Sequence, residues 1–181
     1  QKMTPATQTI QLTGNYQLNG MNEANPYASK ALKTLLGTGE SVKGGIKVYI
    51  GEKGDKAVSK YKKFIPAQAE GYFVRISPKE IVLAGYDERG TYYAVQTFRQ
   101  LMEDGQLPVT DITDWPDIRF RGVVEGFYGT PWSHEARLRH LKFYGENKMN
   151  TYIYGPKDDP YHSSPNWRLP YPEQEAKQLQ Q

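Results

Sequence analysis

Residues 121–162 read RGVVEGFYGTPWSHEARLRHLKFYGENKMNTYIYGPKDDPYH, and the order of apolar and polar residues in this stretch decides the fold class. The segment 119–126 predicts a strand that ends in glycine. Ser133 can cap a helix that runs to about Asn147. A second apolar run, at 151–155, predicts another strand. A strand, a helix and a strand in this order are typical of a parallel βαβ unit.

The residues after this stretch continue the same pattern. The segment 170–181 predicts a second helix. Leu138 and Leu141 of the first helix are expected to face the interior. The chain from residue 118 onward is therefore predicted to alternate strands with helices, as a parallel sheet requires.

The residues before this region predict a separate domain, a small mixed α/β fold of about 105 residues. Asn25 can cap a helix with Pro26 at its first position and Gly37 at its end, and a later helix is predicted to end at Gly105. The predicted strands cover 7–14, 46–51, 72–77 and 81–86, the last two as a hairpin, and the predicted helices cover 25–37, 55–64 and 87–104.

The segment LPVTDITDWPD at 107–117 contains two prolines and several aspartates. This composition is typical of a connection, and it predicts a linker between the two domains. The chain is therefore divided into a domain at 1–117, which includes the linker, and a domain at 118–181.

Composition excludes several classes of protein. The chain of 181 residues has no cysteine, which excludes disulfides, cysteine nucleophiles and thiolate metal sites. Its net charge of +3 comes from scattered lysines rather than a dense basic face, so we expect no nucleic acid partner. No apolar run is long enough to predict a membrane span. The 14 tyrosines fit either sugar faces and wet interfaces or half-buried strands and loops.

Two loops are expected to meet at one edge of the predicted parallel sheet, because its neighbouring strands end on the same side. These loops are 125–132 and 155–162. Their glycines allow a ligand to approach the backbone, Lys157 supplies an ammonium donor, and aromatic walls come from Phe127, Tyr128 and Trp132. This combination suits a neutral polyhydroxylated ligand better than a phosphate, since no phosphate-binding glycine loop is present.

Simpler interpretations of the same residues stay open at this point. Lys157 can pair with Asp158 or Asp159 instead of meeting a ligand. The three histidines are too far apart in the sequence for a metal motif, and we expect neither a metal nor a cofactor: His134, His140 and His162.

The stretch 121–162 resembles the start of the catalytic barrel of glycoside hydrolase family 84, the O-GlcNAcases and related β-N-acetylglucosaminidases. VVEGFYG, followed some thirty residues later by YGPKDD, carries the resemblance. DERGTYYAVQTFRQL at 87–101 resembles the non-catalytic N-terminal domain that this family shares with the β-hexosaminidases. The resemblance is to Bacteroides-type enzymes, and it implies a hexosaminidase domain 2-like unit followed by the first units of a TIM (β/α)8 barrel.

The family resemblance also implies a mechanism. Family members retain configuration by substrate-assisted catalysis, in which the 2-acetamido group of the sugar forms an oxazoline, an exception to the ordinary two-carboxylate scheme. Two adjacent aspartates do this work after the fourth barrel strand, whereas Asp158 and Asp159 follow the second. A carboxylate near Lys157 would also have a lowered pKa, which does not suit a general acid. We therefore expect no catalytic residue in this chain, and we place the catalytic pair beyond Gln181.

The positions that match the family's sugar-binding residues are Gly126, Lys157, Phe127 and Tyr128. The resemblance implies that Gly126 accepts a hydrogen bond from a sugar hydroxyl through its carbonyl and that Lys157 donates one. Phe127 and Tyr128 are expected to lie close to the sugar and its aglycone. Asp158 and Asp159 are expected to hold their loop and orient Lys157. The implied partners are N-acetylglucosamine-containing glycans or glycoproteins.

Residues 118–181 are far fewer than the roughly 250 of a complete barrel. We therefore expect the N-terminal part of an enzyme that is inactive by itself. Its open strand edge should need the remaining barrel, a second copy or the first domain to cover it. The resemblance suggests a secreted or periplasmic protein. The alternative function is a non-enzymatic module that binds carbohydrate or protein.

Overall fold

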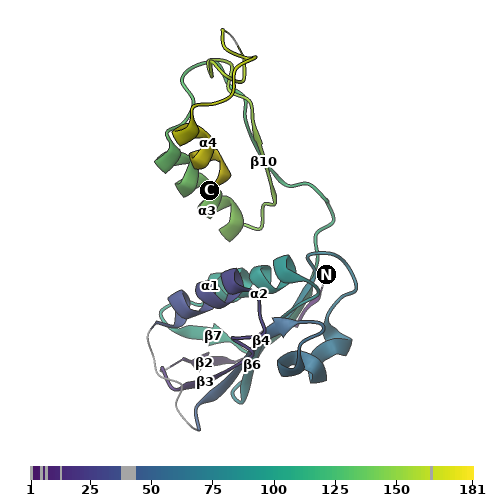
Figure 1. Cartoon of the computed structure of the whole chain (residues 1–181). Coiled ribbons are helices and arrows are strands. Elements are labelled where there is room, and N and C mark those ends of the chain that lie inside the picture. Colours follow the sequence, from purple (N-terminus) through teal and green to yellow (C-terminus); the bar gives the residue numbers. More distant parts are fainter. Residues whose placement is uncertain (1, 5, 7, 13, 38–43, 164) are drawn as a thin grey trace. The chain divides into compact units, whose positions relative to one another are not determined.

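The computed structural model describes residues 2–4, 6, 8–12, 14–37, 44–163 and 165–181. The chain forms two compact units, Gln1–Asp117 and Ile118–Gln181 (Figure 1). Each unit has its own sheet and helices, and each is described by itself. No helix in the described part of the chain is both long enough and apolar enough to cross a membrane.

The first unit is built on a six-stranded mixed sheet with the order β1-β8-β5-β6-β4-β3. Strand β4 runs parallel to both β3 and β6, and the other neighbours in this sheet are antiparallel. Strands β2 and β7 form a separate antiparallel pair. The strands are β1 (Lys2–Met3), β2 (Thr9–Gln11), β3 (Tyr16–Asn19), β4 (Ile46–Glu52), β5 (Tyr72–Ile76), β6 (Glu80–Gly85), β7 (Gln106–Pro108) and β8 (Thr110–Asp114).

The predicted strands at 46–51, 72–77 and 81–86 are confirmed, including the antiparallel hairpin of the last two. The strand predicted at 7–14 is shorter, and its positions 7 and 13 lie outside the described residues.

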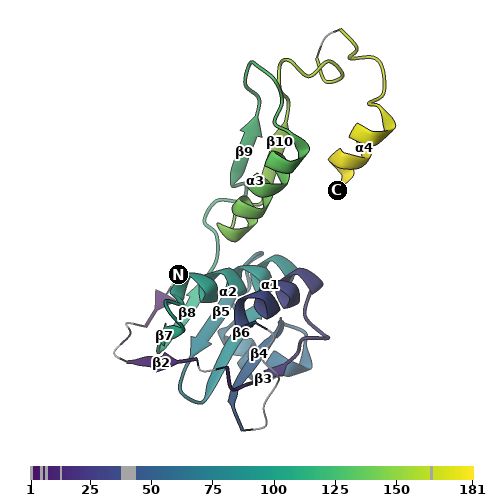
Figure 2. The same cartoon turned by 90° about the vertical axis from the view of Figure 1, so that its left-hand side faces the viewer.

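Two helices, α1 (Pro26–Leu36) and α2 (Glu88–Leu101), lie on one face of this sheet (Figure 1 and Figure 2). The predicted start of α1 is confirmed, because the Asn25 side chain accepts hydrogen bonds from the backbone N–H groups of Tyr27 at 2.8 Å and Ala28 at 3.1 Å. The apolar sides of the helices and the sheet enclose the main core, whose fully buried members include Ala28, Leu32, Val48, Ile50, Val74, Leu83, Ala94 and Phe98.

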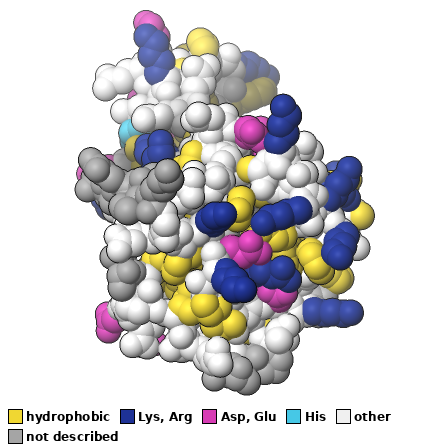
Figure 3. Space-filling model, turned by 90° about the horizontal axis from the view of Figure 1, so that it is seen from below, with side chains coloured by type: hydrophobic (Ala, Val, Ile, Leu, Met, Phe, Trp, Pro, Cys, Tyr) yellow, Lys and Arg dark blue, Asp and Glu magenta, His cyan; other side chains and the backbone are white. Residues whose placement is uncertain are grey.

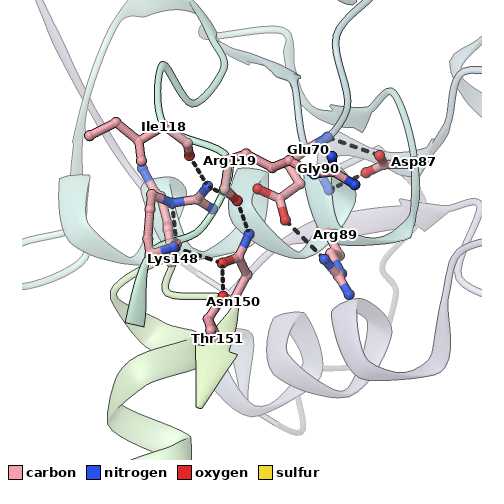
Figure 4. Close-up of polar contacts among 10 residues, drawn as sticks. Glu70, Asp87, Arg89, Gly90, Ile118, Arg119, Lys148, Asn150 and Thr151 are labelled. Atoms are coloured by element: carbon pink, nitrogen blue, oxygen red, sulfur yellow. Dashed lines mark hydrogen bonds and ion pairs between the residues drawn. The ribbon is translucent and has the colours of Figure 1, made fainter. Parts of the chain in front are cut away.

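The amino end of α2 is tied to a neighbouring loop through Asp87 (Figure 4). One carboxylate oxygen of Asp87 accepts a hydrogen bond from the Gly90 N–H at 2.8 Å, and the other accepts one from the Glu70 N–H at 2.9 Å. Arg89 completes the arrangement by donating to the Glu70 carboxylate at 3.2 Å. A single aspartate thus caps the helix and holds the turn before β5.

The segment predicted as a helix at 55–64 forms a 3-10 helix, η1 (Lys56–Phe64), packed against β4 and β6. A 3-10 helix has three residues per turn, and the apolar residues Val58, Tyr61 and Phe64 recur with that period. They meet Phe73 and Val82 in a second core. Figure 3 views the molecule from below the sheet of Figure 1 and shows basic side chains set among acidic and apolar ones. The ion pairs of the first unit include Lys60–Glu80 and Arg75–Asp111.

The linker prediction for 107–117 is wrong. These residues contain most of β7 and all of β8, and β8 lies inside the sheet between β1 and β5. The two aspartates of β8 have partners on β5, since Arg75 binds Asp111 with a shortest distance of 2.6 Å and the Tyr72 hydroxyl donates to Asp114 at 2.6 Å. Strand pairing therefore accounts for aspartates that resemble loop residues in the sequence.

The predicted end of α2 at Gly105 is also wrong, because the helix ends at Leu101. Asp104 and Gly105 have φ values of 48° and 76° and form a turn that leads directly into β7. Gly105 provides the left-handed backbone of that turn rather than of a helix end.

The second unit consists of β9 (Gly122–Glu125), α3 (His134–Glu146), β10 (Thr151–Tyr154) and α4 (Glu173–Gln180). The strands pair in parallel, from Gly122 opposite Thr151 to Glu125 opposite Tyr154. The predicted βαβ unit is confirmed, and so is the cap of α3, where the Ser133 hydroxyl accepts from the Ala136 N–H at 3.2 Å. The closed barrel that the resemblance implies stays a prediction.

The prediction that Leu138 and Leu141 face inward is wrong, since their relative exposures are 36% and 38%. The most buried of the charged side chains on α3 is instead that of Arg137, which binds Glu125 of β9. The face of α3 that turns toward the strands is therefore set by an ion pair. Leu138 follows Arg137 by one position, which places it on the neighbouring and more exposed side of the helix.

Candidate functional site

The loops after β9 and β10 lie at the same edge of the two-stranded sheet and are joined by backbone hydrogen bonds. The Gly155 N–H donates to the Glu125 carbonyl at 2.9 Å, and the Lys157 N–H donates to the Phe127 carbonyl at 3.1 Å. Pairing therefore continues past the ends of both strands. It places Gly126 and Lys157, two of the predicted sugar-binding residues, on adjacent loops.

The other end of the strand pair is held by Asn150 (Figure 4). Its side-chain oxygen accepts from the Arg121 N–H at 3.0 Å, and its side-chain nitrogen donates to the Arg119 carbonyl at 2.8 Å. Arg121 also donates to the Lys148 carbonyl at 3.0 Å. These bonds join the segments that lead into the two strands and help to fix their register.

The predicted contact residues are accessible at this edge. Lys157 is exposed, and Gly126 is partly buried. The relative exposure of Tyr128 is 84%, whereas that of Phe127 is 36% because its ring packs beside Trp132 with the centroids 5.6 Å apart. The two adjacent loops thus present the backbone of Gly126, the ammonium group of Lys157 and the rings of Phe127 and Tyr128.

Glu125 is fully buried immediately before Gly126. Its Oε1 accepts from the Trp132 N–H at 2.9 Å and from Arg137 Nη2 at 3.2 Å, and its Oε2 accepts from Arg137 Nε at 3.1 Å and from the Tyr152 hydroxyl. Burial alone would raise the pKa of the Glu125 carboxyl. The hydrogen bonds from Arg137, Tyr152 and Trp132 outweigh burial and hold the pKa below its ordinary value, so this group is ionised at neutral pH.

Asp159 has the same character in the second loop and is only 4% exposed. Its Oδ1 accepts from the N–H groups of Tyr161 and His162, both at 2.8 Å, and from the Tyr171 hydroxyl at 3.2 Å, while Oδ2 accepts from the Tyr154 hydroxyl. Burial raises the pKa of this carboxyl, and the four hydrogen bonds together lower it below its ordinary value. Asp159 therefore holds its own loop.

Asp158 differs from its neighbour, because it is exposed to solvent. Among the described residues, Lys157 forms no ion pair with Asp158 or Asp159, so the simpler interpretation of this lysine is not supported. The ammonium group of Lys157 remains available at the loop surface.

The three histidines lie apart and have separate surroundings. His134 contacts Gln181 at 3.0 Å, and the His140 ring stands edge-on to Trp132 at 4.3 Å. The His162 ring lies near Gly155, where an added methyl group would come within 3.2 Å of its Nε2. In the described part of the chain, no three side chains of the His, Cys, Asp and Glu types gather as metal ligands would.

Several residues of the site were not singled out by sequence reasoning: Glu125, Arg137, Tyr152 and Tyr154. The alternation of tyrosines at 152 and 154 was an available signal, because residues two apart in a strand share one face. The acid at the end of the apolar run VVE was another, since a buried carboxylate requires partners.

Comparison with known proteins finds a matching family for each of the two units. A family model described as beta-N-acetylglucosaminidase matches residues 121–181, and one described as glycosyl hydrolase family 20, domain 2 matches residues 1–115. The protein O-GlcNAcases of Rattus norvegicus and Mus musculus are each 48% identical over 58 residues, which are 32% of this chain and 6% of theirs.

Solved structures match at the level of the fold. The structure of CpGH84B is 35% identical with a TM-score of 0.85 and covers 98% of this chain, and that of CpGH84D is 25% identical with a TM-score of 0.83 and covers 99%. A beta-N-acetylhexosaminidase from Bacteroides fragilis shares the fold at 19% identity, with a TM-score of 0.60 over 84% of this chain. The chain spans 32%, 33% and 30% of the lengths of these three solved chains.

Proposed function

We propose that this chain, which belongs to the glycoside hydrolases of the family 84 type, forms the N-terminal part of a retaining β-N-acetylglucosaminidase. Its first unit is of the family 20 domain 2 kind. The proposed reaction removes terminal N-acetylglucosamine from glycans or glycoproteins. The acetamido oxygen of the sugar attacks the anomeric carbon while a general acid protonates the departing oxygen. Water then opens the oxazoline with retention of configuration.

The contribution of this chain is one side of the sugar pocket. The Gly126 carbonyl accepts a hydrogen bond from a ring hydroxyl, and the Lys157 ammonium donates one, while Phe127 and Tyr128 flank the sugar and the aglycone. The observation that carries this proposal is the pair of backbone hydrogen bonds between the two loops. These bonds hold the backbone of Lys157 against that of Phe127, the residue after Gly126, and so support assigning both loops to one pocket.

The proton-transfer carboxylates are proposed to lie in other parts of the barrel. A general acid needs a raised pKa, whereas the pKa of Asp159 is lowered and all of its hydrogen bonds hold the loop in place. Asp158 is the other acid of the pair, and its carboxylate faces solvent. Neither aspartate is assigned to catalysis.

The pocket is tested by a sugar titration of the full chain of 181 residues, followed through backbone amide resonances. N-acetylglucosamine is expected to shift the amides of Gly126, Phe127 and Lys157. Replacing Lys157 with glutamine should weaken the response at least about fivefold, since one hydrogen bond to a charged group is lost. Lys142→Gln on the exposed side of α3 is the matched control and should leave the titration unchanged. Sugar-dependent shifts confined to residues 1–117 would contradict the proposal.

Export to the periplasm or the cell exterior is part of the proposal, on the strength of the Bacteroides-type resemblance. Fractionation of cells that produce the complete protein tests it directly. Recovery with the cytoplasmic enzymes would contradict it.

A further inference from the structure

The loops after β9 and β10 are each held by a buried carboxylate that the proposed reaction does not use, Glu125 in the first and Asp159 in the second. We propose that Glu125 is a positioning residue: it sets the conformation of loop 126–131 and, through Arg137, couples that loop to the one that carries Lys157. The effect on sugar binding rests on the proposed function. The effect on loop conformation does not.

Glu125 closes the loop at its base. Its carboxylate binds the backbone N–H of Trp132, so the residue before the loop holds the residue after it. Arg137 strengthens the closure, because it binds both oxygens of Glu125 and also donates to the Trp132 carbonyl at 3.0 Å. Residues 126–131 are thereby joined at both ends.

Such a closure reduces the conformational freedom that the loop would otherwise lose when a ligand binds. Gly126 is the residue most affected, because it directly follows Glu125 and lacks a side chain to hold it. A methyl group at Gly126 would have Val124 Cγ1 at 3.0 Å and the Gly155 carbonyl oxygen at 3.9 Å as its nearest neighbours. The direction of its carbonyl is therefore set mainly by the backbone on either side.

The second loop is connected to the same group of residues. The Arg137 guanidinium lies 4.8 Å from the centre of the Tyr154 ring, and the Tyr154 hydroxyl donates to Asp159. Asp159 is two residues after Lys157 and holds the turn that follows it. A cation–π contact thus links the carboxylate of one loop to that of the other.

The burial of these charges is not explained by stability alone. Replacing a buried ion pair with apolar residues of similar volume is often neutral or stabilising. Here the donors to Glu125 include the N–H at the far end of loop 126–131. The contacts therefore hold backbone atoms of the candidate site, which an apolar core would not do.

Glu125→Gln in the full chain tests the proposal, with Glu135→Gln as the matched control. Glu135 lies on the surface of α3, where it pairs with Arg139 one turn away and, among the described residues, with no other charged side chain. Amide hydrogen exchange at Trp132 and Lys157 is expected to be about tenfold faster in Glu125→Gln, because each N–H loses the geometry of its acceptor. The control should change these rates by less than about twofold.

A second variant, Tyr152→Phe, removes one donor and leaves the Arg137 ion pair in place. It should fold and show a smaller change in the same amides. The sugar titration then supplies a measurement that a general loss of stability would not move: the amide shift of Gly126 at saturating N-acetylglucosamine. It should be altered in Glu125→Gln and preserved in Glu135→Gln.

Equal exchange rates at Trp132 and Lys157 in Glu125→Gln and the control would overturn the assignment of Glu125. Faster amide exchange spread evenly over the second unit would also overturn it, because that is the result expected of a residue that only stabilises the fold. If the unaltered chain shows no sugar-dependent shift, the proposed function loses its support, while the exchange comparison still decides the role of Glu125.

Discussion

Gly90 illustrates how a single residue sets the packing of the first unit. It lies in the first turn of α2, and a methyl group there would come within 2.2 Å of the Gly71 carbonyl oxygen. The sequence motif around it, DERGTYY, therefore has a structural explanation: Asp87 caps the helix and Gly90 allows the neighbouring turn to approach.

We predict that Gly90→Ala destabilises the first unit by about 2 kcal/mol, because backbone must shift to admit the methyl group. Urea denaturation of the full chain, followed in residues 1–117, measures the change. Gly54→Ala is the control, since nothing lies within 4 Å of the position its methyl group would take. A comparable loss in both variants would contradict this explanation.

Asp159 makes the stability of the second unit depend on pH. Its pKa is lowered in the folded protein, so the stability it contributes is present above the ordinary carboxyl value and is lost as the pH falls through the lowered one. Asp159→Asn should therefore cost about 1–3 kcal/mol at neutral pH, and the difference from the unaltered chain should shrink below about pH 4.

Unfolding of unit 2, measured between pH 3 and 7, tests this dependence (these values cover roughly the range of ordinary carboxyl titration). Asp158→Asn changes the exposed neighbour and serves as the control, which should leave the free energy of unfolding at neutral pH almost unchanged. A stability difference that is constant with pH would mean that the Asp159 carboxylate is not responsible.

At the scale of elements, η1 shows how a repeat of three residues produces a 3-10 helix. Tyr61 lies at the centre of its apolar edge, with its ring 5.8 Å from that of Tyr49 and 6.5 Å from that of Phe73. The adjacent edges of the helix carry lysines that remain in solvent. This arrangement places one side of η1 in a core and the other two outside it.

We predict that Tyr61→Ala destabilises the first unit by about 3 kcal/mol, the usual cost of emptying an aromatic site in a core. Lys62→Ala on an exposed edge should change the free energy of unfolding by less than about 0.5 kcal/mol. Thermal or urea denaturation compares them. If the two substitutions cost the same, η1 does not pack as described.

The elements differ in how well local sequence predicts them. The caps at Asn25 and Ser133 are local signals, because a side chain binds backbone two or three residues away, and both helix starts are confirmed. Strand β8 is not local in this sense. Its aspartates are satisfied by Tyr72 and Arg75, which lie some forty residues earlier, and no pattern within 107–117 contains that information.

The candidate site shows the same division. Parallel strand ends placed Gly126 and Lys157 at one edge, as the βαβ pattern predicts. The contact of Glu125 with Arg137 could not be read from spacing alone, since either residue could equally face solvent. It also determines which side of α3 turns inward.

At the scale of the whole molecule, the second unit leaves apolar surface uncovered in the described residues. Val124 and Ile153 are opposite each other in the strand pair, with relative exposures of 59% and 53%. Unpaired strand edges beside such residues promote association with other chains.

We predict that protease cleaves residues 118–181 of the dilute chain before residues 1–117, because the second unit opens more readily. Mass spectrometry of timed digests identifies the fragments. Slower cleavage at higher protein concentration would indicate that a second copy covers the surface. Equal resistance of both units in the dilute monomer would contradict the prediction.

The full chain is predicted to hydrolyse no aryl N-acetylglucosaminide, because Asp159 holds its loop, Asp158 is exposed to solvent, and neither is assigned to proton transfer. A chromogenic assay at high protein concentration measures this. Turnover that Asp158→Asn abolishes would overturn the assignment of the pair. Asp159→Asn is less informative here, since it disturbs the loop in any case.

The sequence by itself determined the helix starts, the βαβ order and the pairing of two glycine-containing loops at one edge, because those features depend on residues close together in the chain. Only the tertiary structure decided that β8 joins the sheet, that Leu138 stays exposed and that Glu125 is buried. Each of these depends on a partner distant in sequence or on which face of a helix meets the sheet, and a polar side chain can enter a protein interior only where such a partner satisfies it.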